Sequence, residues 1–385
     1  MFFLFNLSCI LFFILLLLSS CKVEKHAKIA IELISIVMVM LIASSRVFFQ
    51  TDSDDMIRYF ESYVMASQLD YLDYIGFYRR EIFFESFNWL IANFSSGSLN
   101  VNQYTFILIS PTVLFGYVFF KRVAPDNNIS VAFLCMLMPG LLLVETQLVR
   151  QAMSFFVFLY AMSVNRIRYK YMFLLISIMI HLTSFIYIIF WILGTKILIP
   201  FFKVTKGKFT FLCICIFFGI GSGSSVYYLE IINFFAGLPF VDYKISYLLS
   251  ANFETFSIGK LYLIFCLLLS FVSHVIFLHD DSFLKRAFKL NPDLNELQIN
   301  YIVFNYVLLC FILVFIGIQQ LVERFSVLNF TSMPIFLAYS ISFFKVKNFN
   351  MARLYPVYVI IFFVYYIYMV FQPSDFSLFD GYFIS

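Results

Sequence analysis

Charged residues are scarce in this chain of 385 residues: Asp, Glu, Lys and Arg make up 12% of it, whereas hydrophobic residues make up 62%. An ordinary soluble domain has about 25% charged residues. Half that content cannot cover the surface of a water-soluble globule of this size, and it also excludes a disordered chain, which needs high charge and low hydrophobicity. The sequence therefore predicts a multi-pass membrane protein.

Metal-binding patterns are also missing. The seven cysteines lie in or beside apolar runs without metal-ligand spacing, and the closest pair, Cys213 and Cys215, would point to different faces of a helix. We therefore expect no metal and no cofactor. The net charge of +4 is small and confined to particular loops, so we expect no nucleic-acid partner. No repeat or appended soluble domain is visible, which predicts a single integral membrane domain over residues 1–385.

Long apolar runs account for most of the chain. A helix needs about 20 apolar residues to cross the hydrocarbon core, and lipid excludes open strands. The candidate spans are residues 2–20, 29–49, 104–120, 209–225, 261–278, 301–318, 327–344 and 354–371, with shorter runs at 129–144 and 151–164 and a long run at 171–202. We predict an all-α polytopic membrane protein with about eleven or twelve transmembrane helices.

Lys and Arg predict the orientation of these spans, because they concentrate in cytoplasmic loops. The basic loops lie at residues 22–28, 121–122, 166–170, 203–208, 285–289 and 345–353. The predicted external parts are the N-terminus, residues 47–102, 145–151, 226–260 and 319–326, and the tail from residue 372. The segment 47–102 is then an external acidic loop, and 226–260 is a second external loop.

Residues 171–202 disturb the alternation of cytoplasmic and external loops. The loops 166–170 and 203–208 both favour the cytoplasm, yet only residues 171–202 separate them. We predict a tight hairpin of two broken, short helices that turns near residues 181–184; the alternative is that one basic loop violates the rule. Non-helical backbone at membrane depth is tolerated only inside protein or beside a wet cavity, so the hairpin predicts a cavity there.

The segment 47–102 carries most of the external acid and begins with Asp52 and Asp55, directly after a span. An aspartate at a helix start accepts hydrogen bonds from backbone N–H groups, which explains one of the three carboxylates of Asp52, Asp54 and Asp55 but not all of them. Arg58 and Tyr59 share a helix face with Asp55. Residues 82–94, which include Glu85, are too short to span the membrane and predict an amphipathic helix at the outer interface.

Three further groups lie near the same membrane face. Arg150 follows an external turn and could simply pair with Glu145; His181 lies within an apolar run and could be a packing histidine; Arg324 lies at the outer end of the run 301–318. Charged groups at membrane depth are functional hypotheses by default. Because a guanidinium binds phosphate oxygens in a bidentate manner, a lipid diphosphate is the anionic partner that these arginines favour.

Short motifs match a known family in order. They are Asp55-Met56-Ile57-Arg58-Tyr59, Glu81-Ile82-Phe83-Phe84, Arg150-Gln151, His181-Leu182-Thr183-Ser184 and Arg324-Phe325. Through them the sequence resembles the Wzy-type O-antigen and polysaccharide polymerases, in particular the EpsG-like branch. The family often has Gly-Thr before the acidic residue of the first motif, and this chain does not, so the equivalent aspartate is Asp52, Asp54 or Asp55.

The resemblance implies a GT-C-like membrane glycosyltransferase of the bacterial cytoplasmic (inner) membrane. Such enzymes polymerise undecaprenyl-diphosphate-linked oligosaccharide repeat units into O-antigen or capsular polysaccharide and exopolysaccharide at the periplasmic face. The growing chain passes to the non-reducing end of a fresh repeat unit, and undecaprenyl diphosphate is released. Besides the lipid bilayer, a polysaccharide chain-length regulator is a further partner that the class admits.

Within this reaction, Arg150 and Arg324 are predicted to stabilise the leaving diphosphate, because preorganised charge is usually the largest catalytic contribution. The base is His181 or Asp55; alternatively His181 binds phosphate and a carboxylate of the first external loop is the base. The predicted substrate-binding residues are Gln151, Asp52, Arg58, Tyr59, Glu81, Glu85 and Ser184.

Other classes remain as alternatives. A lipid-linked oligosaccharide flippase or another transporter usually has inverted repeats with helices broken in both halves, whereas this chain has one broken region and one large one-sided loop. An O-antigen ligase would be expected to carry a larger late external loop than residues 226–260. An O-acyltransferase would be expected to place its His and Arg near the cytoplasmic side.

Overall fold

The computed structural model describes residues 24–45, 55–78, 81–123, 148–199 and 292–314, together with isolated positions between 216 and 336. These residues are helical and contain no strand, as predicted. Contacts divide the chain into two compact units, residues 1–188 with 333–385 and residues 189–332. The first predicted span and the loop 226–260 lie outside the described residues.

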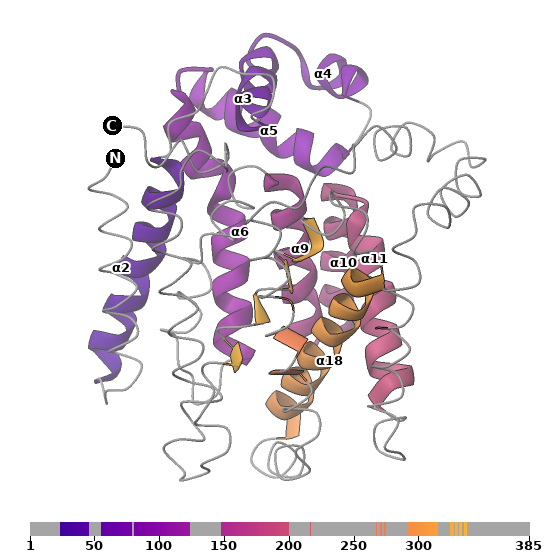
Figure 1. The fold of residues 1–385 in the computed structure, drawn as a ribbon. Coiled ribbons are helices and arrows are strands. Elements are labelled where there is room, and N and C mark those ends of the chain that lie inside the picture. The colour runs from indigo at the N-terminus through magenta and orange to yellow at the C-terminus, as the bar shows by residue number, and fades with distance from the viewer. Residues whose placement is uncertain are drawn as a thin grey trace, which may run out of the picture. The chain divides into compact units, whose positions relative to one another are not determined.

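Four bundle helices of the first unit are α2 (Lys25–Ser44), α6 (Val101–Val123), α9 (Val149–Ser163) and α10 (Ile167–Ile180) (Figure 1). Contacts at both ends make α2 and α6 antiparallel. Asn102 Nδ2 donates to the carbonyl of Ser44 at 2.6 Å, and Lys121 Nζ lies 3.1 Å from Glu32 Oε2. Because the ion pair is half-buried between two apolar helices, it fixes their register.

Helix α6 contains Pro111 in its interior. Proline has no N–H to donate to the carbonyl four residues earlier, here Ile107. The Ser110 hydroxyl donates to that carbonyl instead, at 2.8 Å. Helix α6 and residues 296–314 are the two described helices long and apolar enough to cross a membrane.

A layer of three short helices covers one end of the bundle helices and is called the cap here. It consists of α3 (Asp55–Ala66), α4 (Tyr71–Phe77) and α5 (Ile82–Ser95) (Figure 1). The predicted helix over residues 82–94 is thus confirmed, as is the helix start expected at the aspartates before residue 56. Helix α3 is amphipathic: Met56, Tyr59 and Tyr63 are buried on one face, whereas Arg58 and Glu61 are exposed.

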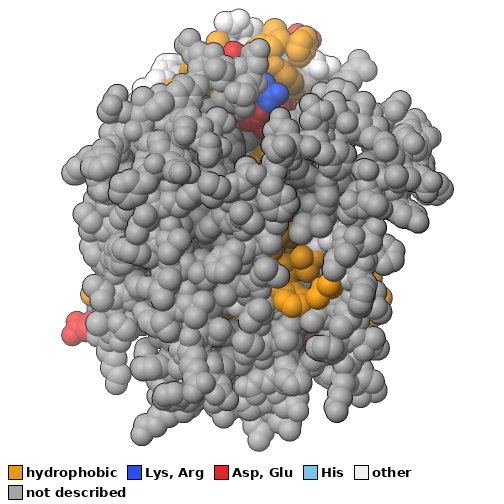
Figure 2. Space-filling model, in the orientation of Figure 1, with side chains coloured by type: hydrophobic (Ala, Val, Ile, Leu, Met, Phe, Trp, Pro, Cys, Tyr) orange, Lys and Arg blue, Asp and Glu red, His pale blue; other side chains and the backbone are white. Residues whose placement is uncertain are grey.

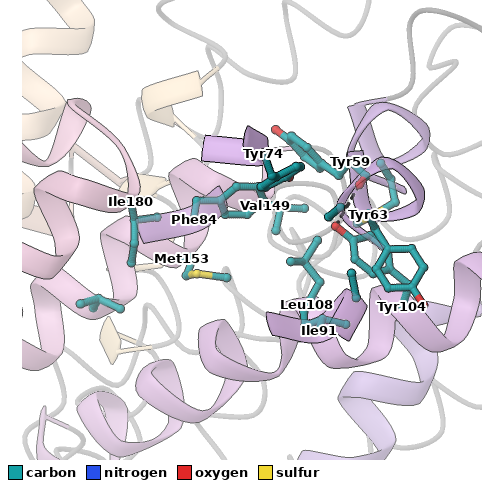
Figure 3. Close-up of a cluster of buried hydrophobic side chains, with 14 residues drawn as sticks. Tyr59, Tyr63, Tyr74, Phe84, Ile91, Tyr104, Leu108, Val149, Met153 and Ile180 are labelled. Carbon is teal, nitrogen blue, oxygen red and sulfur yellow. Dashed lines mark hydrogen bonds between the residues drawn. The ribbon is translucent and has the colours of Figure 1, made fainter. Parts of the chain in front are cut away.

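A cluster of buried side chains joins the cap to the bundle (Figure 3). It contains residues from α3, α4, α5, α6, α9 and α10, and tyrosines form a large part of it. Their rings fill the core while their hydroxyls find partners, as buried tyrosines normally do. The Tyr104 hydroxyl donates to Asn88 Oδ1 at 2.9 Å, and the Tyr63 hydroxyl lies 2.7 Å from Ser95 Oγ. The cap is therefore anchored by apolar packing and by specific hydrogen bonds.

Two glycines of the cap should respond oppositely to alanine. Gly97 has φ +67°, and an added Cβ would lie 2.7 Å from Ser67 Oγ and 2.8 Å from Ser67 Cβ. Gly76, inside α4, has no atom within 4 Å of that position. We expect Gly97→Ala to lower the free energy of unfolding by about 1–3 kcal/mol, and Gly76→Ala to raise it by up to about 1 kcal/mol. Thermal unfolding in detergent measures both; equal effects would contradict the backbone assignment.

The break predicted near residues 181–184 is confirmed. Helix α10 ends at Ile180, His181 is extended with φ −158° and ψ 129°, and α11 (Thr183–Ile192) begins two residues later. The Tyr187 ring of α11 then lies 5.3 Å from the ring of Phe155 and 5.8 Å from that of Phe158, both on α9. The interrupted backbone leaves His181 at the end of the bundle that the cap covers.

In the second unit, α18 (Pro292–Val314) packs against a π-helical segment, η2 (Leu193–Leu198), and the ring centroids of Trp191 and Phe304 are 5.6 Å apart. The buried side-chain amide of Asn329 forms hydrogen bonds within this unit. Asn329 Nδ2 donates to the Asn305 carbonyl at 2.9 Å, and Ser270 Oγ donates to Asn329 Oδ1 at 2.7 Å. Such bonds satisfy polar groups that would otherwise be buried unpaired.

Candidate functional site

Arg150 lies in the first turn of α9 and is held by the cap. Its Nε donates to the Tyr59 hydroxyl at 2.9 Å, and its Nη1 forms an ion pair with Glu81 Oε2. Its Cζ lies 5.1 Å from the ring centroid of Tyr59 and 5.8 Å from that of Phe84. Aromatic faces attract a guanidinium, so two rings and a carboxylate fix the orientation of this group.

Glu81 immediately precedes α5, and its backbone is left-handed with φ 59° and ψ 49°. This conformation is rare for a residue with a Cβ and costs of order 1–3 kcal/mol. The conformation directs the carboxylate toward the bundle: Oε2 pairs with Arg150, and Oε1 lies 3.5 Å from His181 Nε2. Strained residues that persist in a fold cluster at functional sites, and Glu81 fits that pattern.

His181 is held by the start of α11. The Thr183 backbone N–H donates to His181 Nδ1 at 3.2 Å, and the Thr183 hydroxyl lies 2.7 Å from the same nitrogen. A ring nitrogen that accepts an N–H bond carries no proton in the neutral ring. We therefore assign the proton of neutral His181 to Nε2, which faces the Glu81 carboxylate.

Arg150, Glu81 and His181 differ in the exposed fraction of their side chains. The side chain of Arg150 is 33% exposed, whereas those of Glu81 and His181 are 10% and 12% exposed. The described contacts of Arg150 use its Nε–H and one N–H on Nη1, and a guanidinium has five N–H donors. On the face drawn in Figure 2, basic and acidic side chains lie side by side near the top of the view. Arg150 therefore retains donors for an anionic ligand.

Glu85, one turn after Glu81, lies inside the cap and is 5% exposed. The Tyr74 hydroxyl donates to Glu85 Oε2 at 2.6 Å, and the Ser62 hydroxyl lies 3.4 Å from the same oxygen. Burial raises the pKa of Glu85 above its usual value, although the hydrogen bond from Tyr74 and the charge of Arg150 oppose the shift. Glu85 is an interior carboxyl, and its role in substrate binding stays a prediction.

The raised pKa of Glu85 predicts a pH dependence of stability. A carboxyl whose pKa is raised in the folded state contributes stability below its ordinary value of 4.5, and that contribution is lost as the pH rises through the folded-state pKa. We expect the wild-type protein to lose stability relative to Glu85→Gln as the pH rises above 4.5 toward the raised pKa of Glu85. Unfolding temperatures of both proteins across this range measure the difference; parallel curves would contradict the prediction.

The other predicted residues of the first unit are placed as follows. Asp55 forms an ion pair with Arg58 in the first turn of α3, which confirms the predicted shared face for Arg58, whereas Tyr59 lies on the buried face of the helix. Gln151 is buried, and its Nε2 donates to the Tyr187 hydroxyl at 3.2 Å. Ser184 is buried, and its hydroxyl has no hydrogen-bond partner among the described residues.

The structure does not test the placement of two predicted residues at this site. Asp52 lies outside the described residues, and Arg324, which is exposed, belongs to the second unit. Their roles stay predictions. Conversely, sequence reasoning did not assign a role to Phe84 or Thr183, which hold Arg150 and His181. Phe84 carried a signal, as the aromatic position of the motif that begins at Glu81.

The chemistry of these side chains suits the binding of an anion and the transfer of a proton. A fixed guanidinium beside a carboxylate and an imidazole offers positive charge for a phosphate-like group, together with two side chains of the kinds that serve as general acids and bases. Within the described part of the chain, no three His, Cys, Asp or Glu side chains are grouped as metal ligands.

The apolar helices, two of which are long enough to cross a membrane, indicate a membrane protein. The chain belongs to the EpsG family, whose model matches residues 29–382. Membership of this family indicates a polysaccharide polymerase-like transferase. No curated protein and no solved structure matches the chain significantly.

Proposed function

We propose that this protein is a membrane glycosyltransferase that polymerises undecaprenyl-diphosphate-linked oligosaccharide repeat units into O-antigen or capsular polysaccharide and exopolysaccharide. The proposal places its active site at the outer face of the bacterial cytoplasmic membrane, in a GT-C-like protein with about eleven or twelve transmembrane helices. The observation that carries the proposal is the meeting of Arg150, Glu81 and His181 beneath the cap.

The charge of Arg150 suits the leaving group of this reaction. As the glycosidic carbon leaves the lipid diphosphate, negative charge develops on the phosphate oxygens, and a preorganised guanidinium stabilises it most effectively. Tyr59 and Phe84 keep Arg150 oriented before the substrate arrives. In the proposed mechanism, Arg324 supplies a second positive charge to the same diphosphate, and Gln151 and Ser184 support the site from within the bundle.

The cap suits the sugar side of the reaction. Sugar hydroxyls need hydrogen-bond acceptors and sugar rings stack on aromatic faces; the cap offers carboxylates and an aromatic-rich surface. We assign Asp52 and Arg58 to this binding surface, whereas the buried Tyr59 contributes to substrate binding by orienting Arg150. The acceptor hydroxyl must lose a proton to a base within hydrogen-bond reach, for which His181 and the carboxylates Asp55 and Glu81 are the candidates.

Deletion of the gene followed by gel analysis of the surface glycan tests the proposal. A polymerase mutant leaves a lipid core with a single repeat unit, whereas a flippase or ligase mutant leaves none. Purified protein should also elongate lipid-diphosphate-linked repeat units without other proteins. Failure of the purified protein to elongate them, together with a surface that carries no repeat unit at all, would favour a transporter or ligase instead.

A further inference from the structure

The geometry points to Glu81 as the catalytic base of this site, with His181 as the residue that positions it. The inference rests on the proposed polymerase function and assigns the proton transfer within it. It rests on two observations, the occupied nitrogens of His181 and the location of the other cap carboxylates, and on the competition for Arg150 that follows when a phosphate binds beside Glu81.

Both ring nitrogens of His181 are engaged within the protein. Nδ1 faces the backbone N–H and the hydroxyl of Thr183, and Nε2 faces Glu81. A base needs a lone pair that reaches the proton to be removed. The one lone pair of neutral His181 is directed at Thr183, so His181 acts as a donor that orients the Glu81 carboxylate.

The other carboxylates of the cap are placed differently. Asp55 is held by Arg58 at the start of α3, and Glu85 is enclosed by Tyr74 and Ser62. Asp70 and Asp73 are exposed on and beside α4. Among the described acidic residues of the cap, Glu81 is the one that contacts both Arg150 and His181.

Arg150 links the basicity of Glu81 to the binding of the lipid-diphosphate-linked sugar donor. In the structure Arg150 neutralises Glu81, and a carboxylate next to a guanidinium has a low affinity for protons. A diphosphate that binds Arg150 competes for its N–H donors and places negative charge beside Glu81. Like charge raises the proton affinity of a carboxylate, so Glu81 becomes an effective base once the donor is bound.

The charged and titratable groups that face Glu81 are consistent with this role. Arg150 approaches from α9, His181 from the junction of α10 and α11, the Tyr59 hydroxyl from α3, and Glu85 lies one turn further along α5. The left-handed backbone of Glu81 keeps its carboxylate close to Arg150 and His181. Strain of this kind is retained where a fixed orientation is needed.

The reaction balances as follows. The acceptor O–H bond breaks and its proton goes to Glu81, while the oxygen forms a new bond to the anomeric carbon of the donor. The bond between that carbon and the phosphate oxygen breaks, and its electron pair leaves with the lipid diphosphate beside Arg150. Glu81 then passes the proton to the departing diphosphate or to water, and the site returns to its starting state.

The test compares Glu81→Gln with His181→Gln in purified protein supplied with lipid-diphosphate-linked repeat units. The amide of Glu81→Gln keeps the shape and accepts from Arg150 but is not a base. We expect its turnover to fall by about 10²–10⁴-fold, while half-saturation by the donor changes by less than about threefold. His181→Gln still offers an N–H to Glu81 and should retain turnover at least about tenfold above Glu81→Gln.

Two further variants complete the design. Glu61→Gln removes an exposed carboxylate of α3 and should leave turnover unchanged. Glu81→Ala should regain part of its activity with added formate, which supplies a carboxylate, whereas Arg150→Ala should not. If Glu81→Gln does not fold, as judged by circular dichroism and gel filtration, the formate response of Glu81→Ala and the activity of His181→Gln carry the test.

The outcomes separate the inference from the proposed function. A His181→Gln enzyme that is as inactive as Glu81→Gln, absence of formate rescue, or an effect of Glu81→Gln on donor affinity alone would overturn the role of Glu81 as base. A wild-type protein that does not elongate the repeat units would overturn the proposed function itself.

Discussion

Replacement of Arg150 by alanine should reduce polymerisation by about 10²–10³-fold, because loss of one preorganised charge at a developing anion costs about 3–4 kcal/mol of transition-state stabilisation. The same change leaves Glu81 near His181 without its guanidinium partner. Arg150→Lys keeps the charge but loses the planar fork that contacts both Tyr59 and Glu81, so it should recover only part of the activity. Elongation of lipid-linked repeat units by purified variants measures both effects.

Arg168 provides the matched control. It is an exposed arginine near the start of α10, and Arg168→Ala removes the same charge from the chain without touching the site. Its activity should equal that of the wild-type protein. Normal polymer length from an Arg150→Ala strain, or an equal loss in the Arg168→Ala protein, would contradict the assignment of Arg150 to the diphosphate.

Replacement of Asn88 by alanine should destabilise the cap by about 3 kcal/mol, since it removes three buried hydrogen bonds that each contribute about 1 kcal/mol. Asn88 is fully buried in α5 and is the centre of a hydrogen-bond network. Its Nδ2 donates to Ser62 Oγ and to the Tyr74 hydroxyl, both at 3.1 Å, and its Oδ1 accepts from the Tyr104 hydroxyl at 2.9 Å. The variant removes the common partner of three groups in α3, α4 and α6.

Asn93, on the exposed face of the same helix, is the control for this prediction. Its described bond is from Nδ2 to the Trp89 carbonyl, at 3.1 Å. Asn93→Ala should change the free energy of unfolding by less than about 0.5 kcal/mol. Thermal unfolding in detergent compares the two variants. Equal stability of Asn88→Ala and Asn93→Ala would show that the network under the cap adds little to its stability.

The stability of the cap and the chemistry of the site are physically connected. Arg150 is oriented by Tyr59 of α3 and by Glu81 at the start of α5, and the Tyr104 hydroxyl also donates to the Tyr59 carbonyl at 3.1 Å. A loosened cap would therefore misplace the ligands of Arg150. We expect Asn88→Ala to lose activity as well as stability, and Asn93→Ala to lose neither.

Several local features could be predicted because their causes are local. The helices that begin at Asp55 and Ile82 follow from amphipathic spacing, and the break at His181 follows from two basic loops that lie too close together. The pairing of Asp55 with Arg58 needs only the periodicity of one helix. Each of these predictions required knowledge of fewer than about 35 neighbouring residues.

The partner of Arg150 could not be predicted in this way. The neighbour in sequence, Glu145, was the simplest candidate, whereas the structure pairs Arg150 with Glu81, 69 residues earlier. The left-handed backbone at Glu81 and the bond from Thr183 to the ring of His181 were equally invisible. Such contacts depend on how the cap packs against the bundle, and an alternation of apolar and polar residues does not encode that packing angle.

The sequence by itself determined that this chain is a helical protein of the membrane, with charge gathered at a few motifs, because a chain so poor in charge cannot cover a soluble surface. Only the tertiary structure decided which of those charges meet. The packing of the cap on α9 and α10 brings Glu81 to Arg150 and His181, because an ion pair between distant segments forms only where burial of their apolar faces has already fixed the backbones.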